Sequence, residues 1–409
     1  MKLLIAIPAL NEEASIQNII ERCLDARDTI TACSPVTEVD ITVVSDGSTD
    51  RTVELARAYA DRVELIVFDQ NRGYGAAIKE AWSRSDAELL GFLDADGTCD
   101  PVFFSELCTR LERDQADVAL GCRINADSEM PRLRRIGNAL FACLLTAVSS
   151  QRVRDTASGM RVVRRSSLPE LLPLPDGLHF TPAMSARVML VDGLRLSEVD
   201  MPYHEREGQS KLRAGRDGVR FLQVILQTAS LYRPSRLLGL LGLSCLAIAV
   251  ALMVVPSFHY LTNGSLEEWM IYRFILSDLA GISACLLLCT AYVTRRIVDL
   301  TLFFDTRTSA GVGRCGSLFQ SRWFWAAPLV LLALGAGLVV YSFVERVTTG
   351  VTYEHWSRFI AMSFLFAVGL ILSVTRVIDY FLNLVTGRLT YLRTLPAPAA
   401  EPEVSTPVP

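Results

Sequence analysis

The stretch Leu89-Leu90-Gly91-Phe92-Leu93-Asp94-Ala95-Asp96-Gly97-Thr98-Cys99-Asp100-Pro101 decides how the first half of this chain folds. Its mostly apolar start predicts a buried strand, which ends in two carboxylates. Side chains two positions apart on an extended chain point to the same side, so Asp94 and Asp96 would share one edge of a sheet. Paired acids there suit a hard divalent cation that carries a diphosphate. A plain turn is the alternative, because Asp and Gly are common turn residues. Asp100 and Pro101 predict a helix cap and a first helical residue.

Three further strand-and-loop units precede this stretch. Strands are expected at residues 3–7, 41–45 and 64–68, each followed by a loop and a segment of helical periodicity. This alternation predicts an α/β fold, a mostly parallel sheet with helices on both faces. The loops at residues 8–12, 46–50, 71–75 and 94–96 would then gather at the carboxyl ends of the strands, where ligands bind in such sheets. Asn11 is expected to cap the first helix.

A dinucleotide-dependent enzyme is the main alternative for such a fold. Gly73-Tyr74-Gly75 follows a strand and opens a helix, as the GxGxxG fingerprint of dinucleotide-binding folds does. Ile78, however, occupies the third glycine position of that fingerprint. The unit is also the third in the chain, not the first. No GxxxxGKS/T, GxSxG or HExxH motif occurs, so the sequence does not indicate a P-loop, a serine hydrolase or a zincin.

Composition narrows the function classes further. The chain has 409 residues, 51% of them hydrophobic, and a net charge of −4, which argues against nucleic acid as a partner. Ten cysteines occur without CxxC pairs, and we interpret them as reduced core residues, not a disulfide frame or zinc site. The N-terminal segment is too weakly basic for a signal peptide and alternates into a strand, so we expect the catalytic part on the cytoplasmic side.

An ordered series of motifs runs through the first half of the chain. The motifs are IPALNE at residues 7–12, SDGSTD at 45–50, DAD at 94–96, GCR at 121–123, DTASGMR at 155–161 and YHEREGQSK at 203–211. The series covers about residues 1–215 and resembles glycosyltransferase family 2. Its later motifs resemble the polyprenyl-phosphate branch, which includes dolichyl-phosphate mannose synthase. The resemblance implies an A-type nucleotide-sugar fold, a nucleotide-sugar donor, a polyprenyl phosphate acceptor and Mg²⁺ or Mn²⁺.

The resemblance also implies roles for individual residues. Metal ligation and catalysis would fall to Asp94 and Asp96, with Arg123 reaching phosphates near the reaction centre. The nucleotide would be bound by Pro8, Glu12, Asp46 and Ala95. The acceptor phosphate would be held by Arg135, Arg206, Ser210 and Lys211. Such a phosphate is already ionised at neutral pH and can attack the anomeric carbon directly. It therefore needs fixed positive charge more than a general base.

Three positions depart from the family pattern. Thr98 stands where Gln is common, which leaves open whether it touches the cation. Ser45 replaces the first Asp of the common Asp-Asp-Gly-Ser, which leaves the nucleotide base open. His179-Phe180-Thr181-Pro182-Ala183 stands where relatives often carry Phe and then Glu, which leaves the sugar open.

The second half of the chain predicts a membrane domain. Apolar runs at residues 237–255, 274–293, 324–344 and 359–375 are each near the roughly 20 residues that cross a bilayer. A bundle of buried core helices is the alternative, and four successive runs argue against it. We expect a catalytic domain at 1–215, an interfacial helix at 216–236, a four-helix transmembrane domain at 237–393 and a disordered tail at 394–409.

Charged residues in the loops predict the orientation. The loop between the second and third runs carries Arg295, Arg296, Arg307, Arg314 and Arg322, whereas the loop after the first run carries acids and no Lys or Arg before Arg273. The positive-inside rule then places the N-terminal domain and the C-terminus in the cytoplasm. Asp278, near the start of the second run, would lie at the interface or pair within the bundle.

These observations lead to one expected function and two alternatives. We expect inverting transfer of a single hexose from a nucleotide sugar of the GDP-mannose or UDP-glucose type to a polyprenyl phosphate at the bilayer. The spans could also support packing of a homo-oligomer. A processive polysaccharide synthase is the nearest alternative, but Gln320-Ser321-Arg322-Trp323 is one residue short of the QxxRW motif. A non-catalytic polyprenyl-lipid carrier or flippase-like protein is the other, and the intact Asp94/Asp96 pair argues against it.

Overall fold

A computed structural model describes residues 1–126, 128–204, 214–301, 321–350 and 355–394. The chain divides into two compact units, Met1–Arg233 and Pro234–Pro409. Several predicted features lie outside the described residues: Arg206, Ser210 and Lys211, the loop residues Arg307, Arg314 and Gln320, and the tail from residue 395.

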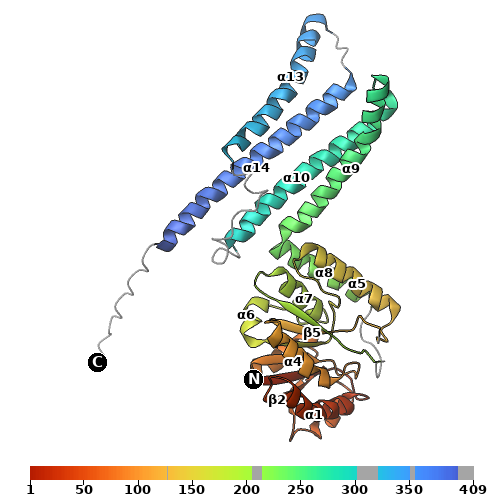
Figure 1. Ribbon diagram of the computed structural model, residues 1–409, viewed down its shortest axis with the longest axis vertical. Helices are drawn as coiled ribbons and strands as arrows, with labels where there is room; N and C mark the ends of the chain where they lie inside the picture. Colours follow the sequence, from red (N-terminus) through yellow and green to blue (C-terminus); the bar gives the residue numbers. More distant parts are fainter. Residues whose placement is uncertain (127, 205–213, 302–320, 351–354, 395–409) are drawn as a thin grey trace, which may run out of the picture. The chain divides into compact units, whose positions relative to one another are not determined.

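A seven-stranded sheet forms the centre of the first unit (Figure 1). Its order is β3-β2-β1-β4-β6-β5-β7, and the five residues of β4 in the middle are all buried. The four strands predicted from the sequence pair in parallel, as do β5 and β7, whereas β6 is antiparallel to both of its neighbours. The strands are β1 (Lys2–Ala9), β2 (Glu38–Asp46), β3 (Glu64–Phe68), β4 (Leu89–Leu93), β5 (Val118–Cys122), β6 (Met160–Arg164) and β7 (Leu196–Asp200).

Helices cover both faces of this sheet. Leu3 and Ile5 of β1 lie in one buried cluster with residues of α1 and α4, and Leu4 and Ala6 lie in the opposite cluster with residues of α3 and α7. This alternation follows from the two-residue period of a strand and confirms the predicted α/β fold. The helices of this unit are α1 (Ile16–Cys33), α2 (Thr52–Arg57), α3 (Tyr74–Arg84), η1 (Pro101–Phe103), α4 (Phe104–Arg113), α5 (Arg132–Val148), η2 (Arg165–Ser167), α6 (Leu168–Leu171), α7 (Phe180–Leu190) and α8 (Ala214–Tyr232).

One edge of the sheet gathers the motif loops. The carboxyl ends of β1 to β4 meet there because these strands are parallel. Since β6 is antiparallel, its start lies at the same edge as the ends of β5 and β7. The segment 155–159 before β6, Arg123 after β5 and Tyr203 after β7 therefore join the loops of the first four strands. Asp100 caps η1 as expected, since its Oδ1 accepts the Val102 amide hydrogen at 3.1 Å.

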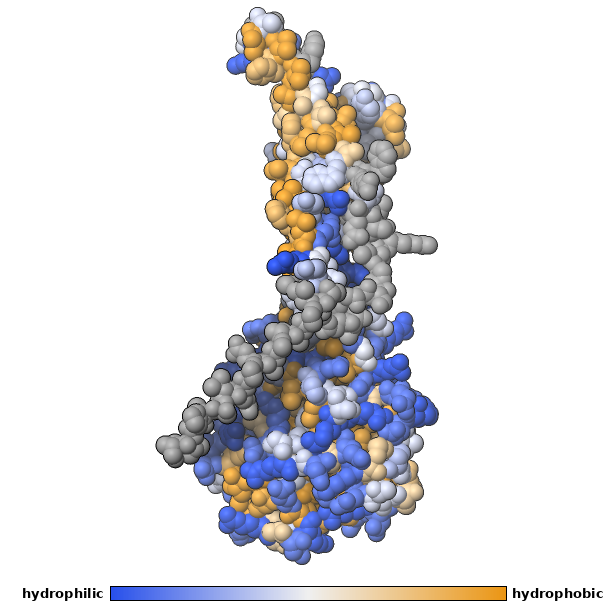
Figure 2. Space-filling model, turned by 90° about the vertical axis from the view of Figure 1, so that its left-hand side faces the viewer, coloured by the Kyte–Doolittle hydropathy of each residue, from blue (hydrophilic) through white to orange (hydrophobic). Residues whose placement is uncertain are grey.

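The second unit consists of long apolar helices. α9 (Pro234–Asn263), α10 (Ile271–Thr301), α13 (Ala326–Thr349) and α14 (Trp356–Thr394) follow one another, with η3 (Glu268–Met270) and η4 (Arg322–Trp325) before α10 and α13. All four are long and apolar enough to cross a membrane, and Figure 2 shows apolar residues over most of their visible surface. Within this unit, α9 packs on α10, α10 on α14 and α13 on α14 (Figure 1). α14 continues well past Thr375, where the apolar run ends.

Candidate active site

Two carboxylates leave the end of the central strand β4. Asp94 follows its last residue and is half-buried, and Asp96 is 7% exposed. Ala95 between them is buried. Because β4 has neighbours on both sides, the backbone that carries the pair is fixed by the sheet. The structure thus places the predicted pair at the edge where the motif loops gather.

Asp94 is held by residues from two other elements. The Tyr74 hydroxyl, at the start of α3, donates a hydrogen bond to Asp94 Oδ1 at 2.6 Å. On the other side, the carboxylate lies against Gly159, where a methyl group would overlap Asp94 Oδ2. The Tyr74 ring itself packs edge-to-face on Phe92 and Phe180, each with centroids 6.4 Å away. Both contacts restrict where the Asp94 oxygens can lie.

Asp96 is oriented by the residue two positions later. Thr98 donates to Asp96 Oδ1 from its hydroxyl at 2.7 Å and from its backbone amide at 3.2 Å. Arg22 of α1 fixes the same turn, because its guanidinium donates to the carbonyls of Gly97 at 3.1 Å and Cys99 at 3.2 Å. Thr98 therefore orients the Asp96 carboxylate.

The loops after β1 and β2 are tied together. Asn11 Oδ1 accepts the Thr49 amide hydrogen at 2.8 Å, and the Glu12 amide donates to Thr52 Oγ1 at 2.8 Å. The expectation that Asn11 caps α1 was wrong: it has a φ of 49°, and Ser15 occupies the cap position. The side chain bridges two loops instead, which a local reading of the sequence cannot reveal.

Asp46, a predicted nucleotide-binding residue, contacts the next loop. Its Oδ1 accepts the Arg72 amide hydrogen at 2.6 Å, and its Oδ2 accepts that of Gly73 at 3.0 Å. The side chain is buried at the end of β2. Asp46 thus shapes the loop that begins α3 and carries Tyr74.

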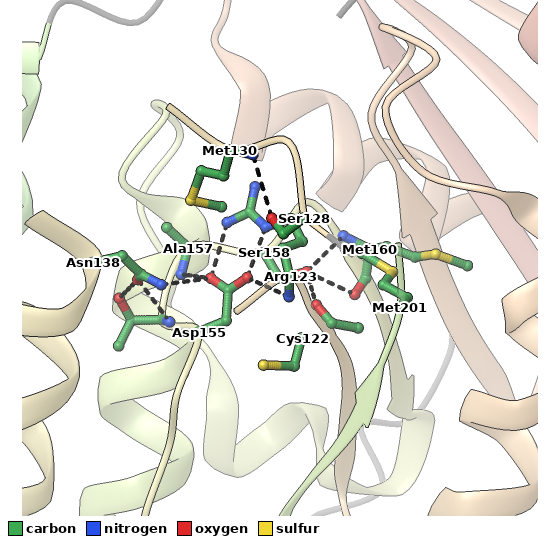
Figure 3. Close-up of polar contacts among 12 residues, drawn as sticks. Cys122, Arg123, Ser128, Met130, Asn138, Asp155, Ala157, Ser158, Met160 and Met201 are labelled. Carbon is green, nitrogen blue, oxygen red and sulfur yellow. Dashed lines mark hydrogen bonds and ion pairs between the residues drawn. The ribbon is translucent and has the colours of Figure 1, made fainter. Parts of the chain in front are cut away.

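Arg123 forms a two-point ion pair at the end of β5 (Figure 3). Its Nε donates to Asp155 Oδ2 at 2.7 Å and its Nη2 to Oδ1 at 2.9 Å. Burial opposes ionisation of Asp155, but the Arg123 guanidinium and backbone amides outweigh burial and lower the pKa of this carboxyl. The Arg123 guanidinium also lies 5.5 Å from the centroid of the Tyr203 ring. The pair holds the Arg123 guanidinium in a fixed position after the end of β5.

Asn138 connects α5 to this ion pair (Figure 3). Its Nδ2 donates to Asp155 Oδ1 at 3.1 Å, and its Oδ1 accepts the Thr156 hydroxyl hydrogen at 2.7 Å. Arg135, one helical turn earlier, is exposed and donates from Nη2 to the Asn125 carbonyl at 3.3 Å. The structure therefore brings Arg123 and the start of α5 to the edge where the Asp94/Asp96 pair lies.

The chain is similar to several known glycosyltransferases. A model of the family "Glycosyl transferase family 2" matches residues 4–172. The low-salt glycan biosynthesis hexosyltransferase Agl6 of Haloferax volcanii is 30% identical over 252 residues, which cover 60% of this chain and 59% of that relative. A dolichyl-phosphate hexose transferase of the same organism is 33% identical over 219 residues, covering 51% of this chain and 86% of that one. The dodecaprenyl-phosphate galacturonate synthase of Rhizobium johnstonii is 27% identical over 277 residues, covering 65% and 78%.

A solved structure is also similar. The glucosyl-3-phosphoglycerate synthase of Mycobacterium tuberculosis, in complex with Mn²⁺, uridine diphosphate and glucosyl-3-phosphoglycerate, has a TM-score of 0.45 and 20% identity, covering 56% of this chain and 79% of that one. The family match covers the strands and loops that carry the Asp94/Asp96 pair. The chain belongs to glycosyltransferase family 2.

Proposed function

We propose that this protein transfers one hexose, with inversion, from a nucleotide sugar to a polyprenyl phosphate on the cytoplasmic side of a membrane. One observation carries the proposal. A carboxylate pair, a fixed arginine and the basic start of α5 lie at one sheet edge, in a family member similar to polyprenyl-phosphate sugar transferases. At such an edge, a cation held by the carboxylates would bind the donor diphosphate. The arginines at the start of α5 would bind the acceptor phosphate.

The carboxylate pair fits a hard divalent cation, Mg²⁺ or Mn²⁺. Among the residues that the structure describes, no three His, Cys, Asp or Glu side chains group as a metal site. Two carboxylates are enough, because Mg²⁺ is usually bound through one or two carboxylates, water and substrate phosphates. Asp94 and Asp96 would hold the cation, while Tyr74 and Thr98 keep their oxygens in place. When bound, the cation would neutralise the charge that develops on the departing nucleotide diphosphate.

Pro8, Glu12 and Asp46 are proposed to form the nucleotide pocket. Their loops are joined by the Asn11–Thr49 and Glu12–Thr52 hydrogen bonds, which keep the ends of β1 and β2 at a constant separation. A preformed pocket costs less ordering entropy when the donor binds. Ser45 stands where the family commonly has Asp, and its hydroxyl donates to the Ser48 hydroxyl at 3.0 Å. This replacement leaves the identity of the nucleotide base open.

The acceptor side is proposed to lie along α5. Arg132, Arg134 and Arg135 begin this helix, and its Leu133, Ile136 and Leu140 are 71%, 60% and 66% exposed. These apolar positions are three and four residues apart, so they form one stripe on the helix. An exposed apolar stripe behind a basic start suits a lipid surface with phosphate headgroups. Arg206, Ser210 and Lys211, outside the described residues, are proposed to complete the phosphate site.

The cytoplasmic orientation rests on the loop charges and can be tested by itself. A single cysteine would be introduced by Arg307→Cys, or by Ser265→Cys as the matched control in the loop between α9 and α10, in a background without native cysteines. Labelling of intact cells with an impermeant thiol reagent should modify the Ser265→Cys protein only. Modification of the Arg307→Cys protein would overturn the proposed topology.

The activity is tested with the full-length protein in membranes. A panel of nucleotide sugars is supplied with polyprenyl phosphate, and the lipid product is analysed by mass. We expect one nucleotide sugar to give a polyprenyl phosphate heavier by a single sugar residue. A long polymer would favour a processive synthase, and donor or lipid binding without any product would favour a non-catalytic carrier.

A further inference from the structure

A polar cluster joins α10 to α14 within the helical unit. Asp379 lies at its centre: Arg376 Nη1 donates to Oδ2 at 2.9 Å, and the Tyr292 hydroxyl donates to Oδ1 at 2.7 Å. Arg296 Nε lies 3.6 Å from the same Oδ1. Asn383 accepts from Arg296 Nη2 at 2.5 Å and donates to Asp379 Oδ2 at 3.3 Å. These five residues are called the Arg–Asp cluster below.

The Arg–Asp cluster lies at the ends of two apolar runs. Arg296 follows the run at residues 274–293, and Arg376 directly follows the run at residues 359–375. Trp325, at the start of the next apolar helix, has its ring centroid 5.4 Å from the Arg376 guanidinium. Tryptophan and arginine at the ends of spanning helices mark the headgroup layer. The cluster is therefore placed at the depth of lipid phosphates, in the leaflet that the proposed orientation makes cytoplasmic.

The Arg–Asp cluster carries one positive charge more than a structural link requires. One arginine paired with Asp379 would join α10 to α14 without net charge. The described residues of the Arg–Asp cluster instead include two arginines, Arg296 and Arg376, against one aspartate, whereas the neighbouring Arg295 is outside the cluster and pairs with Asp299 at 3.7 Å. Asp379 is 1% exposed and Arg376 9% exposed. Keeping an excess charge there is costly unless an anion compensates it.

Arg296 is not fully satisfied within the cluster. Its Nε is buried and forms no hydrogen bond with any residue that the structure describes. Its side chain nevertheless keeps 17% of its surface exposed, so the Arg–Asp cluster is not sealed. Arginine matches phosphate with a planar fork of donors, and basic pockets between membrane helices bind anionic headgroups.

We propose that the Arg–Asp cluster binds the phosphate headgroup of an anionic lipid. Arg296 and Arg376 supply the charge. Tyr292, Asp379 and Asn383 hold the two guanidinium groups in place. All five residues belong to the helical unit, and lipid binding by this site needs neither donor nor transfer. A phospholipid and a polyprenyl phosphate share this headgroup chemistry.

The test measures lipids retained by the full-length protein, purified in detergent and analysed by native mass spectrometry. Phosphatidylglycerol, polyprenyl phosphate and phosphatidylcholine are added in turn, with inorganic phosphate as a competitor. We expect one anionic lipid to be retained and phosphatidylcholine not. Arg296→Gln and Arg376→Gln should lower retention about tenfold, because glutamine removes the charge and the planar fork of donors. The matched control Arg295→Gln, next in sequence but paired with Asp299, should retain lipid as the wild type does.

Several outcomes decide the proposal. Preferential retention of phosphatidylglycerol identifies a phospholipid site, and preference for polyprenyl phosphate identifies an acceptor-lipid site. Equal retention of phosphatidylcholine, displacement by millimolar inorganic phosphate alone, or equal losses in Arg295→Gln and Arg296→Gln would overturn it. If the glutamine variants do not fold, Arg296→Lys against Arg295→Lys answers the same question, because lysine keeps the charge and loses the fork. Because no sugar donor is present, failure here leaves the proposed transferase activity untouched.

Discussion

The hydroxyl of Tyr74 donates a 2.6 Å hydrogen bond to Oδ1 of Asp94, the first carboxylate of the pair. The third strand-and-loop unit thus acts directly on the fourth. Burial, followed by the charge of Asp94, raises the pKa of Tyr74 well above its usual range, so the hydroxyl remains a donor. The flanking glycines allow close packing of this loop, because a methyl group at Gly73 or Gly75 would overlap the carbonyls of Asp176 or Pro175.

Tyr74→Phe should weaken the site without changing the fold. Phenylalanine keeps the aromatic packing on Phe92 and Phe180 but leaves Asp94 Oδ1 without its donor. A hydrogen bond to a charged group contributes about 1.5–3 kcal/mol, so we expect kcat/KM to fall about tenfold or more. The cation concentration that gives half-maximal rate should rise as well.

A matched control exists for this substitution. Tyr59 donates a hydrogen bond of the same 2.6 Å length to Glu21, between α1 and the segment after α2. Tyr59→Phe should leave kcat/KM and the cation requirement unchanged. Equal effects of the two substitutions would show that Tyr74 acts on stability and not on the site.

Gly159→Ala should inactivate the enzyme more strongly than Tyr74→Phe. The added methyl group would overlap Asp94 Oδ2, so the carboxylate must move away from its position. Gly137→Ala is the control, because nothing lies within 4 Å of a methyl group there and alanine favours the α5 helix. Turnover and thermal unfolding are measured for both variants. Wild-type turnover in Gly159→Ala would contradict the described position of Asp94.

Asp155→Asn should destabilise the catalytic unit. Removing one partner of a buried ion pair costs about 3–5 kcal/mol, and the Arg123 guanidinium would lose its counter-charge. Asp200→Asn breaks the exposed Arg154–Asp200 pair and should cost less than about 1 kcal/mol. Urea unfolding of the full-length protein measures both. Equal small losses would refute the structural role of the buried pair.

The Asp155 carboxylate should also make the stability of the folded protein depend on pH. The pKa of Asp155 is lowered in the folded protein, so its contribution is fully present above the unfolded value, about 4, and is lost as pH falls towards the folded value. The wild type should therefore lose stability below about pH 4 more steeply than Asp155→Asn. Parallel acid profiles for the two proteins would contradict this assignment.

Arg206→Ala and Lys211→Ala should raise the polyprenyl phosphate concentration needed for half-maximal rate. The acceptor phosphate loses hydration as it approaches the anomeric carbon, and fixed cations must replace that water. Donor affinity, measured without lipid, should change little if, as proposed, the cation and Arg123 bind the diphosphate. Weaker donor binding with unchanged lipid dependence would show that Arg206 and Lys211 act on the nucleotide and not on the acceptor.

Much of the fold could be predicted from the sequence because its signals are local. β3 and β4 occur at the predicted residues, and Asp100 caps the helix as its spacing indicated. Parallel strands alternating with helices bring their loops to one edge, so the position of Asp94 and Asp96 followed from the pattern alone.

The remaining features depend on contacts between distant segments. Nothing near Tyr74 in the sequence indicates that its hydroxyl reaches a residue 20 positions later. Asn11 resembled a helix cap locally, yet it bonds to Thr49 in another loop. The role of Asn138 could not be foreseen either, because it appears only once α5 packs beside the segment before β6. The motifs at 121–123 and 155–161 pointed to this region, but neither indicated Asn138.

The most direct test compares the wild type with Asp96→Asn in the same membranes, by the mass of the lipid formed from polyprenyl phosphate and the accepted nucleotide sugar. Asparagine keeps the shape of the side chain and can still accept from Thr98, so folding should be unaffected. We predict one added sugar residue per polyprenyl phosphate with the wild type, and a rate at least about a hundredfold lower with Asp96→Asn. Near-normal formation of the same product by folded Asp96→Asn, with an unchanged cation requirement, would contradict the account.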